Sequence, residues 1–320
     1  MGVRMKIGIL GAGTIASTLA ETMNRMKNAE LYAVASRSID KAKSFAKRHC
    51  VPKAYGSYEE MLDDPAVNLV YIATPHSHHA AHMKLCINHQ KPVLCEKAFT
   101  FNAKEAEEIV TLNKKKKVYV AEAMWTRYMP SRKMIDDMIA SGVVGKIHTL
   151  TANLSYNITH KERIMRPELA GGALLDVGVY TLNFALMHFG NEIERIASCA
   201  KMTDTGVDGQ TTITLFYKDG RVANLTSGIY ARSDRKGIFY GENGYIVVEN
   251  INNPQSISAY DSEDKLIEKK KVPPQITGYE YEIEECMSQL RIGETQSESM
   301  PLEASVELMK LMDKVRACWK

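Results

Sequence analysis

The sequence predicts an α/β protein with two domains: first a doubly wound parallel sheet, then a second α/β domain that contains antiparallel hairpins. Over the first 125 residues, short apolar runs with little polar alternation take turns with helical stretches. Such runs are typical of strands buried on both faces of a parallel sheet covered by helices. A glycine-rich loop follows the first run, and hairpin-type turn signals separate strand-like runs from residue 192 onward.

The length of the chain predicts two domains. At 320 residues it is too long for a typical single core. The regular alternation of strand-like and helical stretches ends near Trp125. This predicts a dinucleotide-binding domain over residues 1–125 and a second domain over residues 126–320. The sequence leaves open whether the last helix packs back onto the first domain.

The first domain is predicted as strands and helices in alternation. Strands are expected at residues 5–10, 31–35, 69–73, 93–95 and 118–120. Helices are expected from the glycine loop to residue 26, from residue 38 onward, and after Thr74-Pro75 as far as residue 88.

The second domain is predicted to begin with a helix and a long strand, at residues 131–140 and 146–155. Gly171-Gly172 then opens an apolar helix that runs through Phe189. A series of strands follows, for example at residues 211–217, 222–228, 237–240 and 245–249. Helices near 278–292 and 302–318 close the chain.

Composition and charge exclude several classes of protein. The formal net charge is +3, whereas a dedicated nucleic-acid binder usually carries a strong basic excess. The basic run Lys114–Lys117 lies between a helix and a strand, so a solvated turn is expected there. The first strand begins at Met5, which leaves no room for a signal peptide. No apolar run is expected to reach the roughly 20 residues that cross a bilayer.

The six cysteines are scattered, with no CxxC pair and no metal-ligand spacing. This pattern is typical of reduced thiols rather than of a disulfide framework. We therefore expect a cytoplasmic protein that acts on a small molecule, with neither a nucleic acid nor a membrane as partner.

The segment Gly11-Ala12-Gly13-Thr14-Ile15-Ala16 matches the G-x-G-x-x-A pattern of dinucleotide-binding loops. The first glycine permits the tight turn, and the second lets the backbone approach a pyrophosphate, which the helix N-terminus then attracts. A glycine-rich turn without a ligand is the plainer alternative, but the strand–loop–helix position favours a cofactor. Gly11, Gly13, Thr14 and Ile15 are the predicted cofactor-binding residues of this loop.

The end of the second strand favours NADP over NAD. NAD-binding proteins commonly carry an acid there to bind the ribose 2′-hydroxyl. This chain has Ser36-Arg37-Ser38 instead, and Asp40 falls within the next helix. A guanidinium suits a 2′-phosphate, and the two serines can add hydrogen bonds. The alternative is that Arg37 is only a surface charge.

The histidine-rich segment after the third strand suggests either a metal or a cofactor contact. It begins Thr74-Pro75-His76 and continues to His79, with further histidines at 78, 82 and 89. No cysteine or carboxylate stands nearby at ligand spacing, so no metal is expected. Thr74, Pro75, His76 and His79 are predicted to lie beside the cofactor, and His78, His82 and His89 mostly on helix surfaces.

Two further features suggest catalytic chemistry. Lys97 ends the fourth or fifth strand, and ligands of open α/β sheets bind beyond the carboxyl ends of strands. Asp176 and Tyr180 are four apart on an otherwise apolar helix, so they share a face. A carboxylate in such a helix needs a partner, which a lysine ammonium could supply. A dipole-stabilising Asp and a core Tyr explain the same pattern.

Taken together, the chain resembles the glucose–fructose oxidoreductase, inositol dehydrogenase and rhizopine-catabolism (Gfo/Idh/MocA) family of NAD(P)-dependent oxidoreductases. The residues that carry the resemblance are the Gly11–Ala16 loop, Thr74-Pro75 with His79, Glu96-Lys97, and Gly171-Gly172 with Asp176 and Tyr180. More narrowly, residues 122–128 and 279–282 resemble dimeric dihydrodiol dehydrogenases, which also act as NADP-dependent D-xylose dehydrogenases.

The resemblance implies a Rossmann domain plus an α/β domain whose open, mostly antiparallel sheet often forms an oligomer interface, in a homodimer or a higher homo-oligomer. It also implies that Lys97 and Tyr180 are an acid/base pair at a sugar, cyclitol or dihydrodiol, and that Asp176 orients them. Glu96 and Lys97 join the cofactor-binding set, and Trp125 and Tyr279 are candidate walls of the substrate site.

One residue departs from the family pattern, which usually reads Glu-Lys-Pro. Here Ala98 replaces the proline and removes its fixed φ. Two other functions within the family remain open: a regulator that binds NAD(P) without catalysis, and a glycosidase that uses bound NAD for transient oxidation.

Overall fold

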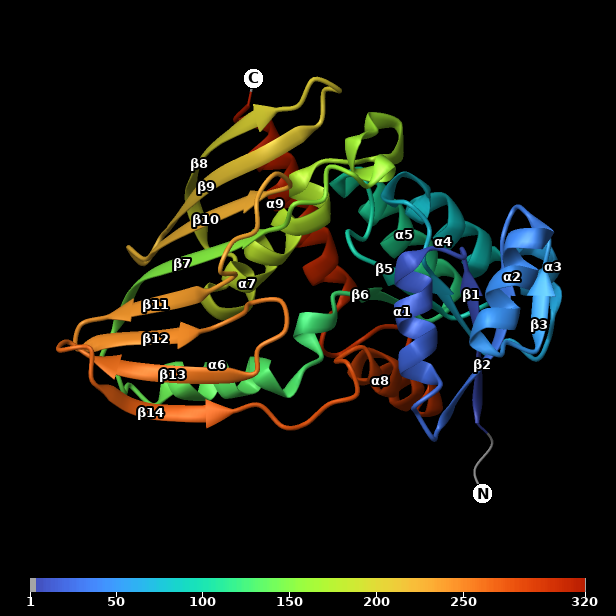
Figure 1. The fold of residues 1–320 in the computed structure, drawn as a ribbon, viewed down its shortest axis with the longest axis horizontal. Helices are drawn as coiled ribbons and strands as arrows, with labels where there is room; N and C mark the ends of the chain where they lie inside the picture. The colour runs from blue at the N-terminus through green and yellow to red at the C-terminus, as the bar shows by residue number, and fades with distance from the viewer. Residues whose placement is uncertain (1–3, 320) are drawn as a thin grey trace. The chain divides into compact units, whose positions relative to one another are not determined.

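The computed structural model describes residues 4–319, and it divides the chain into two compact units (Figure 1). The first unit contains the described residues up to Tyr128 together with Gln275–Val306. The second contains Met129–Pro274 and the described residues from Glu307 onward. A single boundary near residue 125 was expected, but the chain also returns to the first unit at Gln275–Val306.

The first unit is built on a six-stranded parallel sheet with strand order β3-β2-β1-β4-β5-β6. Its strands are β1 (Met5–Leu10), β2 (Ala29–Ala35), β3 (Lys53–Tyr55), β4 (Leu69–Ile72), β5 (Val93–Glu96) and β6 (Val120–Ala123). β4, β5 and β6 are buried throughout, as expected for strands that helices cover on both faces. The predicted doubly wound parallel sheet is confirmed.

Helices connect these strands, and a late helix joins them. They are α1 (Thr14–Met23), α2 (Ile39–His49), α3 (Tyr58–Asp63), α4 (His79–Asn88), α5 (Ala103–Lys116) and α8 (Glu280–Arg291), with short 3₁₀ turns η1 (His76–His78) and η2 (Trp125–Arg127). The apolar side chains Ile283, Cys286 and Met287 of α8 are buried in the same core as β1 and β4. That apolar face explains why residues 275–306 belong to the first unit.

The strand order reverses between β1 and β4, which both pair with parallel neighbours. The amide of Gly11 donates to the carbonyl of Ala35 at 2.9 Å, and the amide of Ala73 donates to that of Leu10, also at 2.9 Å. The loops that follow β1, β2 and β4 are thereby fixed at one edge of the sheet. Ligands of open α/β sheets bind at such a reversal point.

The second unit contains an eight-stranded sheet with order β14-β13-β12-β11-β7-β10-β9-β8. Its strands are β7 (Ile147–Ser155), β8 (Ile193–Met202), β9 (Asp208–Tyr217), β10 (Val222–Gly228), β11 (Gly237–Gly241), β12 (Gly244–Val248), β13 (Ser256–Asp261) and β14 (Leu266–Lys271). Only the pair β7–β10 is parallel. The expected open, mostly antiparallel sheet is confirmed.

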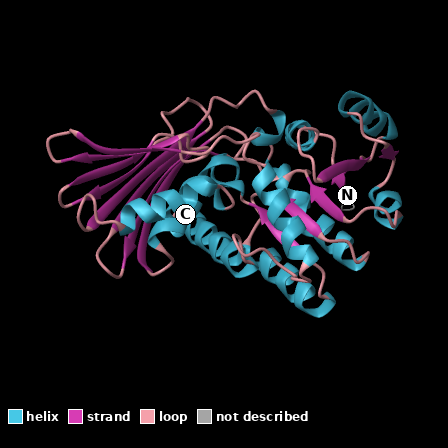
Figure 2. Ribbon diagram, turned by 90° about the horizontal axis from the view of Figure 1, so that it is seen from below, coloured by secondary structure: helices cyan, strands magenta, loops and turns pink. Residues whose placement is uncertain are grey.

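Helices cover one face of this sheet, which Figure 2 shows as a single layer of strands. They are α6 (Pro130–Ala140) and α7 (Val179–Phe189). The 3₁₀ turns η3 (Glu162–Met165) and η4 (Pro167–Leu169) and the π-helical turn η5 (Leu174–Gly178) precede α7 in the chain. α9 (Leu302–Ala317) begins in the first unit and ends in the second.

The helical stretch Pro167–Phe189 is 23 residues long and apolar enough to pass for a membrane span by length and composition. The expectation that no run reaches that length was therefore wrong. Its most apolar window is 83% buried inside the protein, as expected for a core helix.

Candidate active site

The glycine loop after β1 has the geometry of a pyrophosphate cradle. Gly11 has φ +104°, and a Cβ there would lie 3.0 Å from the carbonyl oxygen of Ala73. A Cβ on Gly13, the N-cap of α1, would meet nothing within 4 Å, so the space above it is open. Ala16 is completely buried, and the first turn of α1 carries no acid. These features fit a dinucleotide, whose phosphates would meet the amides of an uncapped helix N-terminus.

The Ser36-Arg37-Ser38 segment follows β2 directly. The hydroxyl of Ser38 caps α2 by accepting from the amide of Lys41 at 3.4 Å, so it already has a structural role. The hydroxyl of Ser36 accepts from the amide of Ser38 at 3.4 Å. Arg37 is exposed. Asp40 lies in the first turn of α2, where a carboxylate favours the helix dipole.

His79 is buried and links two strand ends. Its Nδ1 lies 2.8 Å from the carbonyl oxygen of Ala98, and its Nε2 lies 2.8 Å from that of Thr74. Burial lowers the pKa of His79 to about 4, so the ring is neutral near pH 7 and donates to one carbonyl at a time. His76 is also buried, and its ring lies edge-on to that of His79, with centroids 5.6 Å apart.

His82 differs from its expected place on a helix surface. The ring is half-buried, and its Nδ1 lies 2.9 Å from the hydroxyl oxygen of Thr74. The ring of Tyr58, at the start of α3, packs against it in a T-shaped contact with centroids 4.9 Å apart. This contact could not be predicted from a local motif, because Tyr58 lies on a different helix.

Lys97 follows the last residue of β5, and the Lys97–Ala98 peptide bond is cis. The amide of Lys97 donates to Glu96 Oε2 at 3.2 Å, and the hydroxyl of Tyr71 donates to the other oxygen, Oε1. Glu96 is almost fully buried, with 6% of its surface exposed. The buried Glu96 carboxylate therefore holds the backbone at Lys97, the predicted catalytic residue, through a hydrogen bond.

Contacts beyond Lys97 hold the segment that lacks the family proline. Ala98 is completely buried, and its carbonyl faces His79. The amide of Phe99 donates to Oε1 of Glu122 at 3.1 Å. Packing and hydrogen bonds therefore fix the backbone after Lys97 without a proline.

Two buried glutamates near Glu96 were missed by the sequence. Glu122 lies in β6 and Glu282 in α8, and both are completely buried. Burial raises the pKa of Glu122 to about 7. Burial and the nearby Glu96 raise the pKa of Glu282 well above its usual value, and among the described residues neither of its oxygens has a hydrogen-bond partner. For Glu122, the one signal in the sequence is a charged residue within an otherwise apolar strand. Glu282 has no comparable signal.

Trp125 and Tyr279, the candidate substrate-site walls, are brought together within the first unit. Their rings stack with centroids 4.3 Å apart and planes 13° from parallel. The sequence placed them 154 positions apart, and the return of residues 275–306 to this unit unites them.

Asp176 and Tyr180 lie in the second unit, at the junction of η5 and α7. The amide of Val179 donates to the carbonyl of Leu174, five residues earlier, which is the π-helical bond. Asp176 and Tyr180 are 7% and 8% exposed. Arg163 Nη2 lies 2.8 Å from Asp176 Oδ1, so this unit itself supplies a cationic partner for the carboxylate. Arg163 lies in a 3₁₀ turn outside the helix pattern, and sequence reasoning missed it.

The start of this helix is shaped by Gly172 and Asp208. Gly172 has φ +103°, and a Cβ there would lie 2.2 Å from Asp208 Oδ1. The amide of Leu174 donates to Asp208 Oδ2 at 2.6 Å, so a carboxylate from β9 caps the turn that carries Asp176. Burial raises the pKa of Asp208 to about 6.

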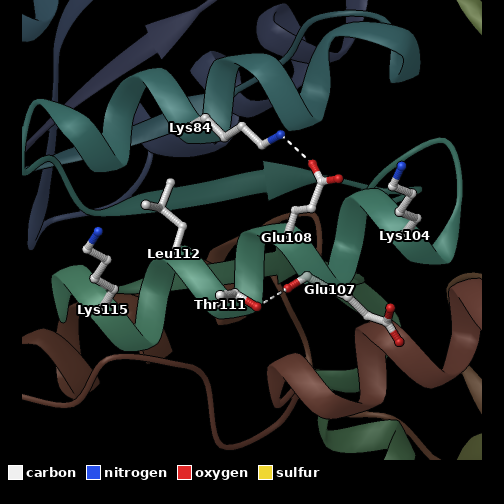
Figure 3. Close-up of a pocket in the computed structure, with 7 residues that line it drawn as sticks. All are labelled: Lys84, Lys104, Glu107, Glu108, Thr111, Leu112 and Lys115. Carbon is white, nitrogen blue, oxygen red and sulfur yellow. Dashed lines mark hydrogen bonds and ion pairs between the residues drawn. The ribbon is translucent and has the colours of Figure 1, made fainter.

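A surface hollow of about 500 Å³ lies on α4 and α5 and contains none of the predicted site residues (Figure 3). Lysines and glutamates line it, and Lys84 pairs with Glu108 at 2.6 Å. The side chains of Lys84 and Glu108 are both exposed, and exposed pairs of this kind contribute about 0–1 kcal/mol. Over residues 4–319, no cluster of three His, Cys, Asp or Glu side chains could hold a metal ion.

Comparison with protein families confirms the resemblance. Residues 5–124 match the model of an oxidoreductase family with an NAD-binding Rossmann fold, GFO_IDH_MocA, and residues 133–247 match the GFO/IDH/MocA C-terminal domain. Human trans-1,2-dihydrobenzene-1,2-diol dehydrogenase is 32% identical, over 98% of this chain and 96% of its own. The enzyme of the same name from Danio rerio is also 32% identical, with the same coverage of both chains.

Solved structures show the same fold. The 3-ketoreductase KijD10 from Actinomadura kijaniata, in complex with NADP and TDP-benzene, has a TM-score of 0.91 at 23% identity, over 99% of this chain and 98% of its own. An aldose–aldose oxidoreductase from Caulobacter crescentus has a TM-score of 0.88 at 19% identity, over 99% and 97%. The sequence relatives and both family models agree, and the chain therefore belongs to the Gfo/Idh/MocA family of NAD(P)-binding oxidoreductases.

Proposed function

We propose that this oxidoreductase prefers NADP and transfers hydride between the nicotinamide and a hydroxyl or carbonyl of a sugar, cyclitol or dihydrodiol. The observation that carries the cofactor preference is the exposed Arg37 directly after β2, in the place where NAD enzymes commonly carry an acid. The substrate class is supported by the relatives, which are named for a dihydrobenzene diol.

The cofactor-binding residues are proposed along one edge of the parallel sheet. Bound there, the nicotinamide ring accepts or supplies hydride at C4. The proposed set comes from the ends of β1, β2, β4 and β5: Gly11, Gly13, Thr14, Ile15, Ser36, Arg37, Ser38, Thr74, Pro75, His76, His79, Glu96 and Lys97. Within this set, His79 and Ser38 act indirectly. Their polar side-chain atoms form hydrogen bonds with backbone groups and so position the loops that would contact the cofactor.

The catalytic roles are proposed from the chemistry of each side chain. Tyr180 passes the proton to or from the substrate oxygen, and Lys97 holds that oxygen and lowers the pKa of the phenol. An unperturbed tyrosine, with a pKa of about 10, is a poor base at neutral pH, so it needs such a cation. Asp176, held by Arg163, orients the group. Trp125 and Tyr279 offer an aromatic wall to substrate.

The test is a panel of sugars, cyclitols and diols assayed by reduced-nicotinamide absorbance, with NADP and NAD in parallel. We expect turnover with NADP to exceed turnover with NAD, and Arg37→Asp to reverse that order. Equal or better rates with NAD in the unmodified enzyme would overturn the cofactor preference. A protein that binds cofactor but turns over nothing would instead be a regulator.

The catalytic roles are tested by Lys97→Met and Tyr180→Phe. Loss of either side chain is expected to reduce turnover on the order of 100-fold or more, as for removal of a general acid or base. Urea-unfolding midpoints close to that of the unmodified protein control for folding in both variants. Near-normal rates in both would sink the assignment.

We also propose a cytoplasmic homodimer formed through the second unit's sheet. Free thiols at all six cysteines support the compartment. A row of tyrosines on the sheet face opposite α6 and α7, exposed at Tyr240 and half-buried at Tyr245 and Tyr260, supports the interface.

A further inference from the structure

We propose that His82 completes the site for the phosphomonoester on the adenosine 2′-position of the cofactor, as a neutral N–H donor beside Arg37, with Tyr58 as the residue that positions its ring. The inference rests on the proposed NADP preference and deepens it. It names two residues that neither the glycine-loop pattern nor the segment after β2 contains.

Side chains that follow three different strands gather in this part of the first unit: Tyr58 and Thr74 contact His82, and Arg37 is close enough for its charge to act on His82 and Tyr58. Arg37 follows β2, Tyr58 begins the helix after β3, and Thr74 follows β4. His82 reaches them from the first turn of α4, with its ring 4.9 Å from that of Tyr58 and its Nδ1 2.9 Å from Thr74. All lie on elements that follow the carboxyl ends of neighbouring strands in the order β3-β2-β1-β4.

The hydrogen bond to Thr74 decides which ring nitrogen is available. When the Thr74 hydroxyl donates to Nδ1, the proton of a neutral imidazole resides on Nε2. Nε2 of His82 has no hydrogen-bond partner among the described residues, and the ring is half-buried rather than sealed. A donor that is fixed in direction and still accessible suits a ligand oxygen.

The charges around the ring favour an anion. Burial is the main cause that lowers the pKa of His82 to about 4, and the nearby His78, His79 and Arg37 add to it, so the ring stays neutral. Burial raises the pKa of Tyr58, the nearby Arg37 lowers it, and the acidic neighbour Glu59 raises it by a smaller amount. A phosphate dianion would neutralise Arg37 and accept from Nε2–H, whereas an unphosphorylated ribose does neither.

Tyr58 contributes through geometry. Its ring edge limits rotation of the imidazole, and the Thr74 bond fixes the ring plane from the other side. Aromatic pairs in a T-shaped arrangement contribute about 0.5–1.5 kcal/mol beyond area burial. Tyr58→Leu is therefore expected to weaken phosphate recognition less than loss of His82 itself.

Calorimetry on the full-length protein tests the proposal with two probes, adenosine 2′,5′-bisphosphate and adenosine 5′-monophosphate. We expect His82→Leu to weaken binding of the bisphosphate on the order of tenfold, the effect of one hydrogen bond to a charged group, and to leave the monophosphate within about twofold. His82→Gln keeps an N–H donor and should recover most of the loss. His89→Leu is the matched control, because His89 follows the far end of α4 and contacts Asp63.

Two outcomes overturn the proposal: equal weakening of both probes by His82→Leu, which would indicate a structural role, and no weakening of either. A histidine proton spectrum gives a readout independent of that variant. In the unmodified protein the His82 signals should shift with the bisphosphate and not with the monophosphate, and an unchanged signal contradicts the contact.

The same experiment separates this inference from the NADP preference. If the unmodified protein favours the bisphosphate and Arg37→Ala removes that preference while His82→Leu does not, only the role of His82 fails. If the unmodified protein binds both probes equally, the cofactor preference and the role of His82 fail together.

Discussion

Three buried carboxyl groups lie behind the residue proposed to act on substrate. Glu96 accepts hydrogen bonds from Tyr71 and from the amide of Lys97, whereas Glu122 accepts one and Glu282 none among the described residues. Glu96 is also a cause of the raised pKa of each of the other two. Carboxyls that interact in this way do not all ionise together, and the raised pKa values of Glu122 and Glu282 favour the neutral form of both.

Glu122→Gln tests this picture through stability. Its folded-state pKa of about 7 lies above the value of about 4.3 expected in an unfolded chain. Between these values the unfolded state releases the proton first, so the native enzyme loses stability as pH rises. Gln removes that loss, and the variant should gain on the order of 3 kcal/mol relative to the native enzyme from about pH 4.5 to about pH 8.

Urea unfolding at the two pH values measures the gain. Glu284→Gln, at an exposed position of the same helix as Glu282, is the control and should show no pH-dependent difference. A constant difference between the Glu122→Gln variant and the native enzyme across this range would mean that Glu122 is ionised in the folded protein.

Arg163→Met tests the partner of Asp176. The ion pair is largely buried on the Asp176 side, with 9% of that side chain exposed against 42% for Arg163. Removing the cation disfavours the carboxylate, so the acid limb of the activity profile should move to higher pH and kcat/KM at neutral pH should fall on the order of tenfold. Arg163→Lys should restore part of this. Arg166→Met, which breaks the exposed pair with Glu162, should leave the profile in place.

At the scale of elements, the sequence predicts those that are long or end in a strong signal. The glycine loop located α1, and the apolar runs located β1, β4 and β5. β3 has three residues, too few to display a period, and β14 is mainly charged because it is an edge strand. β3 was not predicted, and β8, β13 and β14 were not located individually within the series of strands expected over residues 192–271.

The candidate site also has a part that the sequence predicts and a part that it does not. A local motif with fixed spacing predicts the residues Gly11, Arg37, Lys97 and Tyr180. The partners that act on these residues come from elsewhere in the chain, as with His82 for the segment after β2. The π-helical turn at Asp176 also escaped prediction, because an apolar helix gives no sign of one extra residue in a turn.

Gly172→Ala tests the start of the helix that carries Asp176. The position has φ +103°, and a Cβ would collide with the Asp208 carboxylate that caps Leu174. We expect a loss of more than 2 kcal/mol, from left-handed strain of about 1–2 kcal/mol plus a disturbed cap. Gly206→Ala is the matched control, with φ +88° and nothing within 4 Å, and should show the strain alone. Equal losses in thermal or urea unfolding would show that the collision is relieved at no cost.

At the scale of the whole molecule, the chain passes between its two units three times, after Tyr128, Pro274 and Val306. The candidate cofactor loops and the stacked Trp125 and Tyr279 belong to the first unit, whereas Asp176 and Tyr180 belong to the second. The proposed catalytic residues Lys97 and Tyr180 therefore lie in different units. None of these candidate residues lies on the outer face of the second unit's sheet, which is the face opposite α6 and α7.

That outer face carries a row of tyrosines across three strands. Tyr240, Tyr245 and Tyr260 stand opposite one another in register on β11, β12 and β13, with ring centroids 6.2 and 5.2 Å apart. The residues between them point the other way into the core, as the buried Phe239 and Ile246 illustrate. Tyrosine is enriched at interfaces because its large ring contributes area at little entropic cost.

A homodimer through this row should sediment at twice the chain mass of 35.8 kDa. The double substitution Tyr240→Glu with Tyr260→Glu places like charges in a self-complementary contact and should yield the monomer. Ile292→Glu, at an exposed position that follows α8 in the first unit, is the control and should keep the dimer. A native protein that sediments as a monomer at micromolar concentration contradicts the dimer outright. A dimer that survives the double substitution places the interface on another surface.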